Sequence, residues 1–415
     1  MGDHVSAIEV LLTKRDYKRA EVLIARLLRG TLDTESRLQL LIIRARTRLA
    51  TGRIDDALVD LQKVRSLRQT EFDQPHLLEL WGDCHLARFE RAPVGFSERS
   101  DIQQSRSCYE HIVHEFPTYP NLGWIHYQIG RIFLTEHRTA EASGYFQNAL
   151  LEPSTFSALT PFCYERLGFI EFYELRHLER ALHFLGKAVD TYPSQEDPTW
   201  LAQVHTLRSR VLREMRRFDE AVEASRMAIN IASASDSKRG VADALLTIGE
   251  ILFPLPNREK ETIQYLQQFI QISKKPLGID VTWARVYEML GDLYYRIGQY
   301  ANSLASYDAS LQYNPYTPWE MSMHYRLART AYQAGEYERA LHGIERMIRA
   351  AEKDGESVED HRVFALRGNA HYALDQYGEA IKAYEQAKSL ASPNSPDLET
   401  INQYLQFALN FARRV

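Results

Sequence analysis

The sequence predicts an all-α protein built from about ten stacked helix hairpins and a final capping helix. First, a small residue recurs at intervals of 37 to 42 residues, apart from one interval of 48. Second, another small or short residue follows each of these, 12 or 13 residues later in eight of nine cases. Third, no alternating apolar run of strand length stands between turn signals. Such regularity favours a repeat array.

We call the recurring small residues anchors and the residues that follow them followers. The anchors are Ala45, Gly82, Gly130, Gly168, Ser209, Gly249, Gly291, Ala328 and Gly368. The followers are Ala57, Ser105, Ala142, Ala181, Ala221, Thr262, Ser303, Ala340 and Ala380. Small residues in the middle of two consecutive helices let the backbones approach closely, while bulky neighbours fill the seam. We therefore expect anchors and followers to lie where antiparallel helices cross.

The pattern places each hairpin in order along the chain. The expected hairpins span residues 3–32, 36–68, 74–117, 121–153, 159–193, 199–233, 239–274, 280–315, 319–352 and 359–391. The first is inferred because KRDYKRA matches the start of later second helices. The third contains an insert at 89–104, rich in polar residues with Pro93 and Gly95, which predicts a protruding loop. Gly52, Gly298 and Gly335 are expected to end first helices.

Residues 396–415 are expected to form a capping helix. Asp397 is the expected N-cap, and the periodic apolar face comprises Ile401, Leu405, Ala408 and Ala412. A terminal helix of this kind covers the exposed seam of a last repeat. The same apolar helix could instead pair with a second copy of the chain.

The clearest unit, YEMLGDLYYRIGQYANSLASYDASLQYNP, carries the signature of a known repeat. At its signature offsets stand Leu290, Gly291, Tyr294, Tyr300, Ser303, Tyr307 and Pro315, and the segments 127–153 and 367–387 match as well. The chain therefore resembles the tetratricopeptide repeat family over nearly its whole length. Its long repeats are similar to those of kinesin light chains and of regulatory domains in bacterial transcription activators. The resemblance implies one right-handed superhelical solenoid over 1–415 that binds peptides or partner proteins.

Composition narrows the possible functions. The net charge of −5 argues against a nucleic-acid partner for the whole molecule. The sequence shows no signal peptide and no membrane-spanning apolar run, and its three cysteines form no disulfide framework, so we expect a cytoplasmic location. The start MGDHVS fits a loose myristoylation pattern, although Asp3 and Ser6 equally suit helix capping.

Charge is nevertheless uneven along the chain. Residues 1–70 carry 14 Lys and Arg against 9 Asp and Glu, which gives +5 there and −10 in the remainder. Arg37, Arg44, Arg48 and Arg53 contribute to this basic end. A solvated helix face is the favoured interpretation, and a site for an acidic partner is the alternative.

No motif indicates catalysis or a cofactor. The sequence lacks a Gly-rich phosphate loop, a nucleophile motif and a paired-carboxylate signature, so we expect no catalytic residue. Cys84, His85, Cys108, His111 and His114 lie near one another in sequence, but their spacing enforces no tetrahedral site. We therefore expect neither a metal nor a cofactor.

Function is then expected on the face formed by the first helices of the hairpins. The positions six and three before an anchor, and one, four or five after it, share one helix face. The binding residues predicted from these offsets are Trp124, Tyr127, Arg131, Arg210, Arg213, Arg285, Tyr295, Arg296, Arg329, Tyr332, Arg362, Asn369 and Tyr372. Arg and Tyr suit a peptide of mixed charge with apolar anchors.

Three functions remain open from the sequence. The favoured one is an interaction scaffold that binds a peptide or protein in a groove. The second is a peptide-sensing regulator whose superhelix changes pitch on binding. The third is a structural subunit of a larger assembly. Some members of the resembled family clamp acidic chaperone tails with Lys and Asn, and because only Asn369 matches in type here, that ligand is not expected.

Overall fold

The computed structural model describes residues 2–67, 74–92, 99–152, 158–193, 198–353 and 355–413. Within these ranges the chain forms helices and turns, with no strand. The chain divides into two compact units, Met1–Glu196 and Asp197–Val415, called unit 1 and unit 2. One continuous array through both units stays a prediction. The loop expected at 89–104 is shorter than predicted, because residues 89–91 and 99–104 are helical; residues 93–98 lie outside the described residues.

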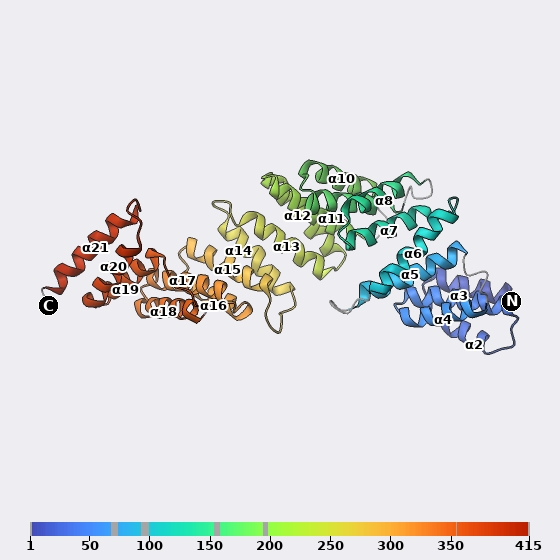
Figure 1. Cartoon of the computed structure of the whole chain (residues 1–415), viewed down its shortest axis with the longest axis horizontal. Coiled ribbons are helices and arrows are strands. Elements are labelled where there is room, and N and C mark those ends of the chain that lie inside the picture. The colour runs from blue at the N-terminus through green and yellow to red at the C-terminus, as the bar shows by residue number, and fades with distance from the viewer. Residues whose placement is uncertain are drawn as a thin grey trace. The chain divides into compact units, whose positions relative to one another are not determined.

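The described residues of unit 1 form five helix hairpins (Figure 1). Its helices are α1 (Gly2–Thr13), α2 (Tyr17–Leu28), α3 (Thr34–Ala50), α4 (Ile54–Leu67), α5 (Pro75–Arg91), α6 (Arg99–Glu115), α7 (Leu122–Thr135), α8 (Thr139–Leu151), α9 (Thr160–Phe169) and α10 (Leu178–Thr191). A π-helical turn, η2 (Ile170–Glu174), continues α9. Each helix contacts the next along the chain.

In the part of unit 2 that the structure describes, five further hairpins are followed by one last helix (Figure 1). Its helices are α11 (Thr199–Glu214), α12 (Phe218–Ala234), α13 (Lys238–Leu252), α14 (Glu259–Ile272), α15 (Val281–Arg296), α16 (Tyr300–Tyr313), α17 (Thr317–Gln333), α18 (Tyr337–Lys353), α19 (His361–Ala373), α20 (Tyr377–Leu390) and α21 (Asp397–Ala412). Here too, consecutive helices are in contact.

The anchors lie at the helix crossings, as the sequence predicts. A Cβ atom added to any of the six anchor glycines would come within 3.0 Å of a large side chain of the second helix. These side chains are Tyr109, Phe146, Leu185, Leu266, Tyr307 and Tyr384. All nine followers are fully buried. The crossings therefore have room for an aromatic ring or a leucine only because the opposing residue has no side chain.

The hairpin turns share one backbone conformation. Gly52, Gly298 and Gly335 follow first helices with φ values of +81°, +75° and +78°, which confirms their expected role. In one of these turns the Gln299 amide donates to the Tyr294 carbonyl at 2.8 Å, and the Gly298 amide to Tyr295 at 3.0 Å. This is the Schellman arrangement, which satisfies the last carbonyls of a helix.

In the other hairpin turns too, one residue has a positive φ value. This residue lies seven residues after most anchors but eight after Gly168 and Gly249. These are the two units in which anchor and follower are 13 rather than 12 residues apart. The extra residue is absorbed by the π-helical turn η2 in one unit. In the other it is absorbed after α13, which ends at Leu252 before Pro254. A local insertion next to the turn thus leaves both helix crossings intact.

Helix α21 closes unit 2 with a buried face and a polar face. Ile401, Leu405 and Ala408 are buried as expected, whereas Ala412 is exposed. The opposite side carries a polar stripe of Glu399, Gln403, Gln406 and Asn410, all exposed. The expectation for Asp397 is corrected: Pro396 is the N-cap residue, and Asp397 lies in the first turn. A polar outer stripe suits a helix that ends a stack.

Candidate functional site: the first-helix face of unit 2

Ten of the predicted binding residues belong to unit 2, and we call this set the first-helix face. It comprises Arg210, Arg213, Arg285, Tyr295, Arg296, Arg329, Tyr332, Arg362, Asn369 and Tyr372. They come from α11, α15, α17 and α19, each the first helix of its hairpin. Trp124, Tyr127 and Arg131 lie in unit 1 and are described separately.

At the N-terminal end of this face, neighbouring first helices are joined by charge pairs. Arg213 Nη1 donates to Glu250 Oε2 at 2.7 Å, and Arg285 Nε lies 3.8 Å from Glu250 Oε1. Arg210 Nη2 donates to the Thr247 hydroxyl at 3.4 Å. Charges of opposite sign on these neighbouring first helices therefore pair with one another. A ligand for these arginines would have to compete with Glu250.

Another charge cluster joins α15 and α17. Arg326 contacts the Asp292 carboxylate and also lies 3.1 Å from Glu288 Oε1. Asp292 accepts a second hydrogen bond, at 2.6 Å, from the hydroxyl of the buried Tyr307. Burial raises the pKa of Glu288, although Arg326 partly opposes this rise. Arg326 is thus committed to the contact between two hairpins.

Aromatic rings support two of the predicted arginines. The guanidinium carbon of Arg296 lies 4.7 Å from the Phe253 ring centroid, and Arg296 Nη1 donates to the Phe253 carbonyl at 2.9 Å. The guanidinium carbon of Arg329 lies 4.4 Å from the ring centroid of Tyr295. Stacking of this kind holds the guanidinium plane while leaving its edge donors free to bind.

The two remaining tyrosines of the face pack at hairpin turns. The ring centroids of Tyr332 and Tyr337 are 5.6 Å apart, and those of Tyr372 and Tyr377 are 5.5 Å apart. Phe411 of α21 extends the second pair, with its ring stacked 5.5 Å from Tyr377. Tyr332 and Tyr372 are therefore partly committed to packing within their own hairpins.

A cavity of about 270 Å³ opens among α17, α19, α20 and α21. It is lined by Tyr325, Arg329, His361, Arg362, Ala365, Leu366, Asn369, Tyr384, Asp397, Thr400, Ile401 and Tyr404. Three predicted residues, Arg329, Arg362 and Asn369, are thus brought together in one place. The other seven predicted residues of unit 2 are not among the lining side chains.

Within this cavity Arg329 differs from the other predicted arginines. Its Nε atom is buried and has no hydrogen-bond partner. No ion pair joins its guanidinium to another residue in the described part of the chain. By contrast, Arg362 is held by Asp360, with Nε 3.0 Å from Oδ1 and Nη2 2.7 Å from Oδ2. Buried donors without partners are uncommon in proteins, so Arg329 indicates a site for an acceptor.

Sequence reasoning missed the contributions of α20 and α21 to this cavity. No residue of α20 was predicted to bind, and α21 was expected either to cap the last repeat or to pair with a second copy of the chain. Tyr404 could have been found by treating α21 as the first helix of an eleventh hairpin. In that register, Asp397, Thr400 and Tyr404 take the positions of the binding residues in α17 and α19.

The three predicted residues of unit 1 have different surroundings. Tyr127 is 8% exposed, with its ring 5.6 Å from that of buried Phe146, so it belongs to the core. Trp124 is 36% exposed and stacks 5.8 Å from Tyr127. Arg131 contacts the Glu90 carboxylate and donates to Gln128 Oε1 at 2.7 Å. Trp124 is therefore the most accessible of the three.

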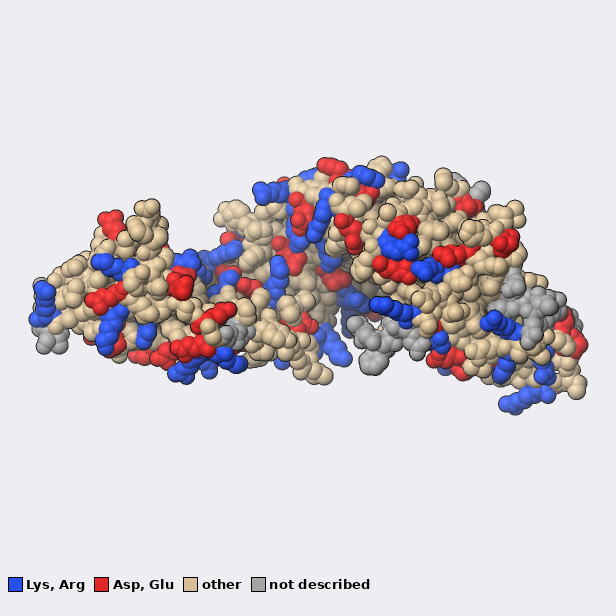
Figure 2. Space-filling model, viewed as in Figure 1, with Lys and Arg blue, Asp and Glu red and all other residues tan. Residues whose placement is uncertain are grey.

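Three of the four arginines named at the basic N-terminal end pair with carboxylates within the fold. Asp60 is fully buried and accepts from Arg44 Nη2 and Arg48 Nη1, both at 2.6 Å. Arg53 donates to Glu21 Oε1 at 2.7 Å. These arginines hold α2, α3 and α4 together. The favoured interpretation, a solvated helix face, is therefore wrong for them. On the face seen in Figure 2, both charge signs are interspersed.

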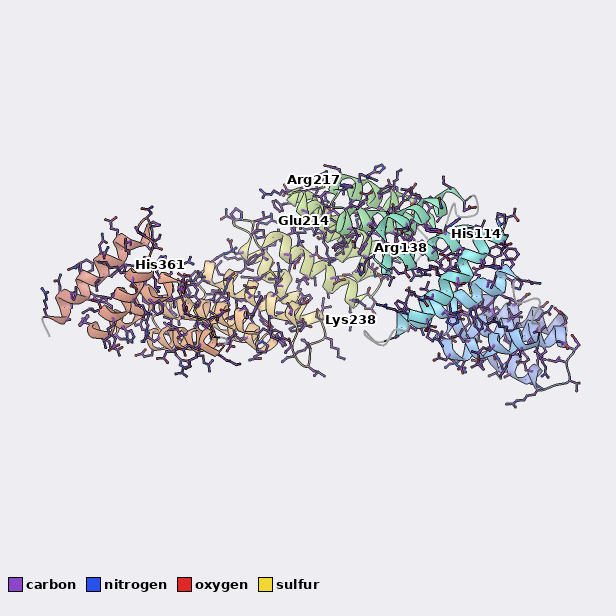
Figure 3. The ribbon with its side chains drawn as sticks, in the orientation of Figure 1. His114, Arg138, Glu214, Arg217, Lys238 and His361 are labelled. Carbon is purple, nitrogen blue, oxygen red and sulfur yellow. The ribbon has the colours of Figure 1, made fainter. Side chains whose placement is uncertain are left out.

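The histidines and cysteines of α5 and α6 do not converge. Cys84 is buried, and the Nδ1 of buried His85 lies 2.6 Å from Asp101 Oδ1. His114 lies near the end of α6 (Figure 3). Among the described residues, no three His, Cys, Asp or Glu side chains are grouped to hold a metal ion. No helix of the described ranges is both long and apolar enough to cross a membrane.

Comparison with known proteins adds one family and several repeat proteins. The family described as 26S proteasome subunit RPN7 matches residues 254–406. No curated protein matches the sequence significantly.

Three solved structures illustrate the similarity. A tetratricopeptide repeat protein from Parabacteroides merdae is 16% identical, with 69% of this chain and 99% of that chain covered and a TM-score of 0.40. The C-terminal part of a repeat protein from Cytophaga hutchinsonii is 17% identical, with 66% and 98% covered and a TM-score of 0.49. YrrB, described as having an unusual peptide-binding site, is 13% identical, with 56% and 98% covered and a TM-score of 0.40. With its hairpins crossing at small anchors, the chain has a tetratricopeptide-repeat-like fold.

Proposed function

We propose that this protein is a non-catalytic scaffold that binds a peptide segment or partner protein at the C-terminal part of the first-helix face. The observation that carries the proposal is the cavity beside Arg329, where an arginine without an acidic partner meets three tyrosines. Arginine and tyrosine are the side chains most often found at the energetic centre of protein interfaces. The expected cytoplasmic location is part of this proposal.

The internal charge pairs support placing the binding site at the C-terminal part of the first-helix face. Arg213 and Arg326 already face carboxylates within the fold. Displacing such a partner would leave a partly buried carboxylate uncompensated, which is unfavourable. Arg329 has no such partner, so an incoming acceptor displaces only water. The candidate site therefore narrows from the whole face to the region around α17, α19 and α21.

Charge reversal at this region tests the proposal. Arg296 and Arg329 are changed together to Glu, and the matched control changes Arg339 and Arg349 of α18 to Glu. Both control arginines are exposed and pair only with exposed carboxylates. Each tagged protein is expressed in its native cell, and co-purified proteins are quantified by mass spectrometry.

We expect the recovered amount of at least one partner to fall more than about tenfold when Arg296 and Arg329 are changed, and to stay the same in the control variant. A tenfold loss corresponds to the loss of one good polar contact. Melting curves check that both variants fold. Equal retention of every partner by both variants would contradict the proposal.

A second candidate function, a subunit of a larger assembly, is favoured by the match of residues 254–406 to a family described as a proteasome subunit. Under this function the chain would be found mainly in one large complex of fixed composition. Light scattering of the purified chain across concentrations and gel filtration of cell extract separate the possibilities. A single large species in extract supports the assembly subunit, and a concentration-dependent dimer supports self-association through α21.

A further inference from the structure

We infer that the surface between α5 and α7 is a second binding site, in unit 1, which takes one arginine side chain of a partner protein. Its acceptors are the carboxylates of Glu79 and Asp83, which we call the unit 1 acid pair, and Trp124 forms its aromatic wall. This site goes beyond the proposed function, because it lies on other helices than the cavity beside Arg329 and binds a cation.

The unit 1 acid pair has a counterpart in unit 2. Glu79 and Asp83 stand three residues before and one residue after their anchor, and Glu288 and Asp292, the unit 2 acid pair, take the same two positions. In both hairpins the aspartate accepts a hydrogen bond at 2.6 Å from a tyrosine of the second helix. In both, 25 residues separate the follower from the next anchor, so the next first helix follows in the same register.

The cation that neutralises the unit 2 acid pair has no equivalent in unit 1. In unit 2, Arg326 stands two residues before the next anchor and contacts both acids. In unit 1 that position is Gln128, which is neutral and donates to Asp83 Oδ1 at 3.3 Å. Glu79 accepts from the Tyr119 hydroxyl, which is neutral as well. Within the described residues, no ion pair joins a Lys or Arg to the unit 1 acid pair.

The missing cation leaves Asp83 with an unfavourable charge. Burial, and to a smaller extent the nearby Glu79 carboxylate, raises the pKa of Asp83 to about 6. A guanidinium beside the pair would oppose this rise, as Arg326 opposes the rise for Glu288 in unit 2. The unit 1 acid pair is therefore arranged for a cation that the described part of the chain does not supply.

Trp124 favours arginine over other cations. The indole is 36% exposed, and the corresponding position of α17 holds the small Ser322. A guanidinium can stack on an indole while its fork donates to two carboxylates, which the single ammonium of lysine does less well. Calcium ions usually take about six or more oxygen ligands, and two carboxylates supply too few.

Small probes test this chemistry on the full chain. N-acetylarginine amide represents the partner's side chain, and N-acetylcitrulline amide is its neutral counterpart of nearly the same shape. N-acetyllysine amide and calcium ions are the competing cations. Binding is measured by ligand-observed NMR titration. We expect N-acetylarginine amide to bind with a dissociation constant on the order of 1–10 mM, and N-acetylcitrulline amide at least about tenfold more weakly.

Variants locate the binding. Asp83→Asn should weaken it more than about tenfold. Gln128→Arg should weaken it similarly, because it supplies within the chain the guanidinium that Arg326 supplies in unit 2. The matched control, Gln147→Arg on the exposed side of α8, adds the same charge elsewhere in unit 1 and should leave binding unchanged. Arg46→Gln, which removes an exposed cation of α3 near His76 and Tyr119, should not weaken binding.

The reverse exchange tests the comparison between the two units. Arg326→Gln gives α17 the residue that α7 has, and it leaves the unit 2 acid pair without its cation. N-acetylarginine amide should then protect peptides of α15 and α17 from hydrogen exchange by about tenfold, at about ten times its dissociation constant. N-acetylcitrulline amide should not protect them.

Binding at the unit 1 acid pair should also depend on pH. The groups facing Asp83 are Glu79 of its own helix, the Tyr109 hydroxyl of α6, and Gln128 and Trp124 of α7. Because Asp83 takes up a proton below about pH 6, the proton competes with the cation. N-acetylarginine amide should therefore bind about tenfold more weakly at about pH 5 than at about pH 7.5, whereas arginine itself stays charged throughout.

Several results would overturn the inference. They are equal binding of N-acetylcitrulline amide, tighter binding of lysine or calcium than of arginine, and binding that survives both Asp83→Asn and Gln128→Arg in folded protein. Absence of added protection in Arg326→Gln would overturn it as well. None of these results depends on the co-purification experiment at Arg296 and Arg329, so either site can fail while the other holds.

Discussion

Replacing Gly291 by alanine should open one helix crossing of unit 2. The added Cβ would come within 3.0 Å of three ring carbons of Tyr307. Tyr307 is fully buried, and its hydroxyl donates to Asp292 at 2.6 Å, so the ring cannot move aside without losing that bond. The Ser303 hydroxyl also donates to the Gly291 carbonyl at 2.8 Å, which fixes the approach of α15 and α16.

The magnitude follows from these contacts. Overpacking costs about 1–3 kcal/mol, and loss of a hydrogen bond to a charged group costs about 1.5–3 kcal/mol. The better helix propensity of alanine offsets about 1 kcal/mol. We therefore expect a net loss of roughly 1.5–5 kcal/mol in the local opening free energy, which is a change of about 10- to 4,000-fold in hydrogen-exchange protection.

The assay is native-state hydrogen exchange of peptides from α15 and α16, because a long repeat array need not unfold in one step. The matched control is Gly186→Ala in α10, where an added Cβ would meet nothing within 4 Å. This variant should gain about 0.5–1 kcal/mol, since glycine is unfavourable inside a helix. Unchanged protection of α15 and α16, or the same sign of effect in both variants, would refute the packing argument.

Three other predictions concern turns, pH and buried charge. Arg216 has φ +59°, so Arg216→Gly should stabilise unit 2 by about 0.5–1 kcal/mol in thermal melts, and a lower melting temperature would contradict this. Burial raises the pKa of Asp83 to about 6, so its folded form keeps a proton that the unfolded chain releases near pH 4. Stability should therefore fall by up to about 3 kcal/mol as pH rises from about 4 to 6, and Asp83→Asn should lack this slope; parallel pH profiles of both proteins would disprove it. Asp60→Asn should lower the local opening free energy of α3 and α4, measured by hydrogen exchange, by about 3–5 kcal/mol, because two arginines would lose their buried partner. A loss below about 1 kcal/mol would count against this prediction.

The fold could be predicted from the sequence because its determinants are local and repeated. Each crossing needs one residue without bulk, so Gly291 and Gly368 mark their helices independently of any distant contact. The turn glycines mark the ends of first helices for a similar reason, because left-handed backbone is unfavourable for most residues. The pattern recurs along the chain, and an error in one unit is corrected by its neighbours.

The candidate site was only partly predictable because it depends on pairing between hairpins. Residue spacing placed Arg213 and Arg329 on the same face. It did not show that Glu250 neutralises Arg213 while Arg329 has no acidic partner. Tyr127 occupies a predicted binding position and is nevertheless buried against Phe146. Which arginine remains available is set by the neighbouring hairpin, and helix periodicity alone does not contain that information.

The most direct test of the central claim is a hydrogen-exchange footprint of the full chain bound to a purified partner. If the partner binds the first-helix face beside Arg329, peptides from α17, α19 and α21 should gain protection, while the exposed side of α18 should not change. Protection confined to α18, or to helices of unit 1, would contradict the assignment of the site.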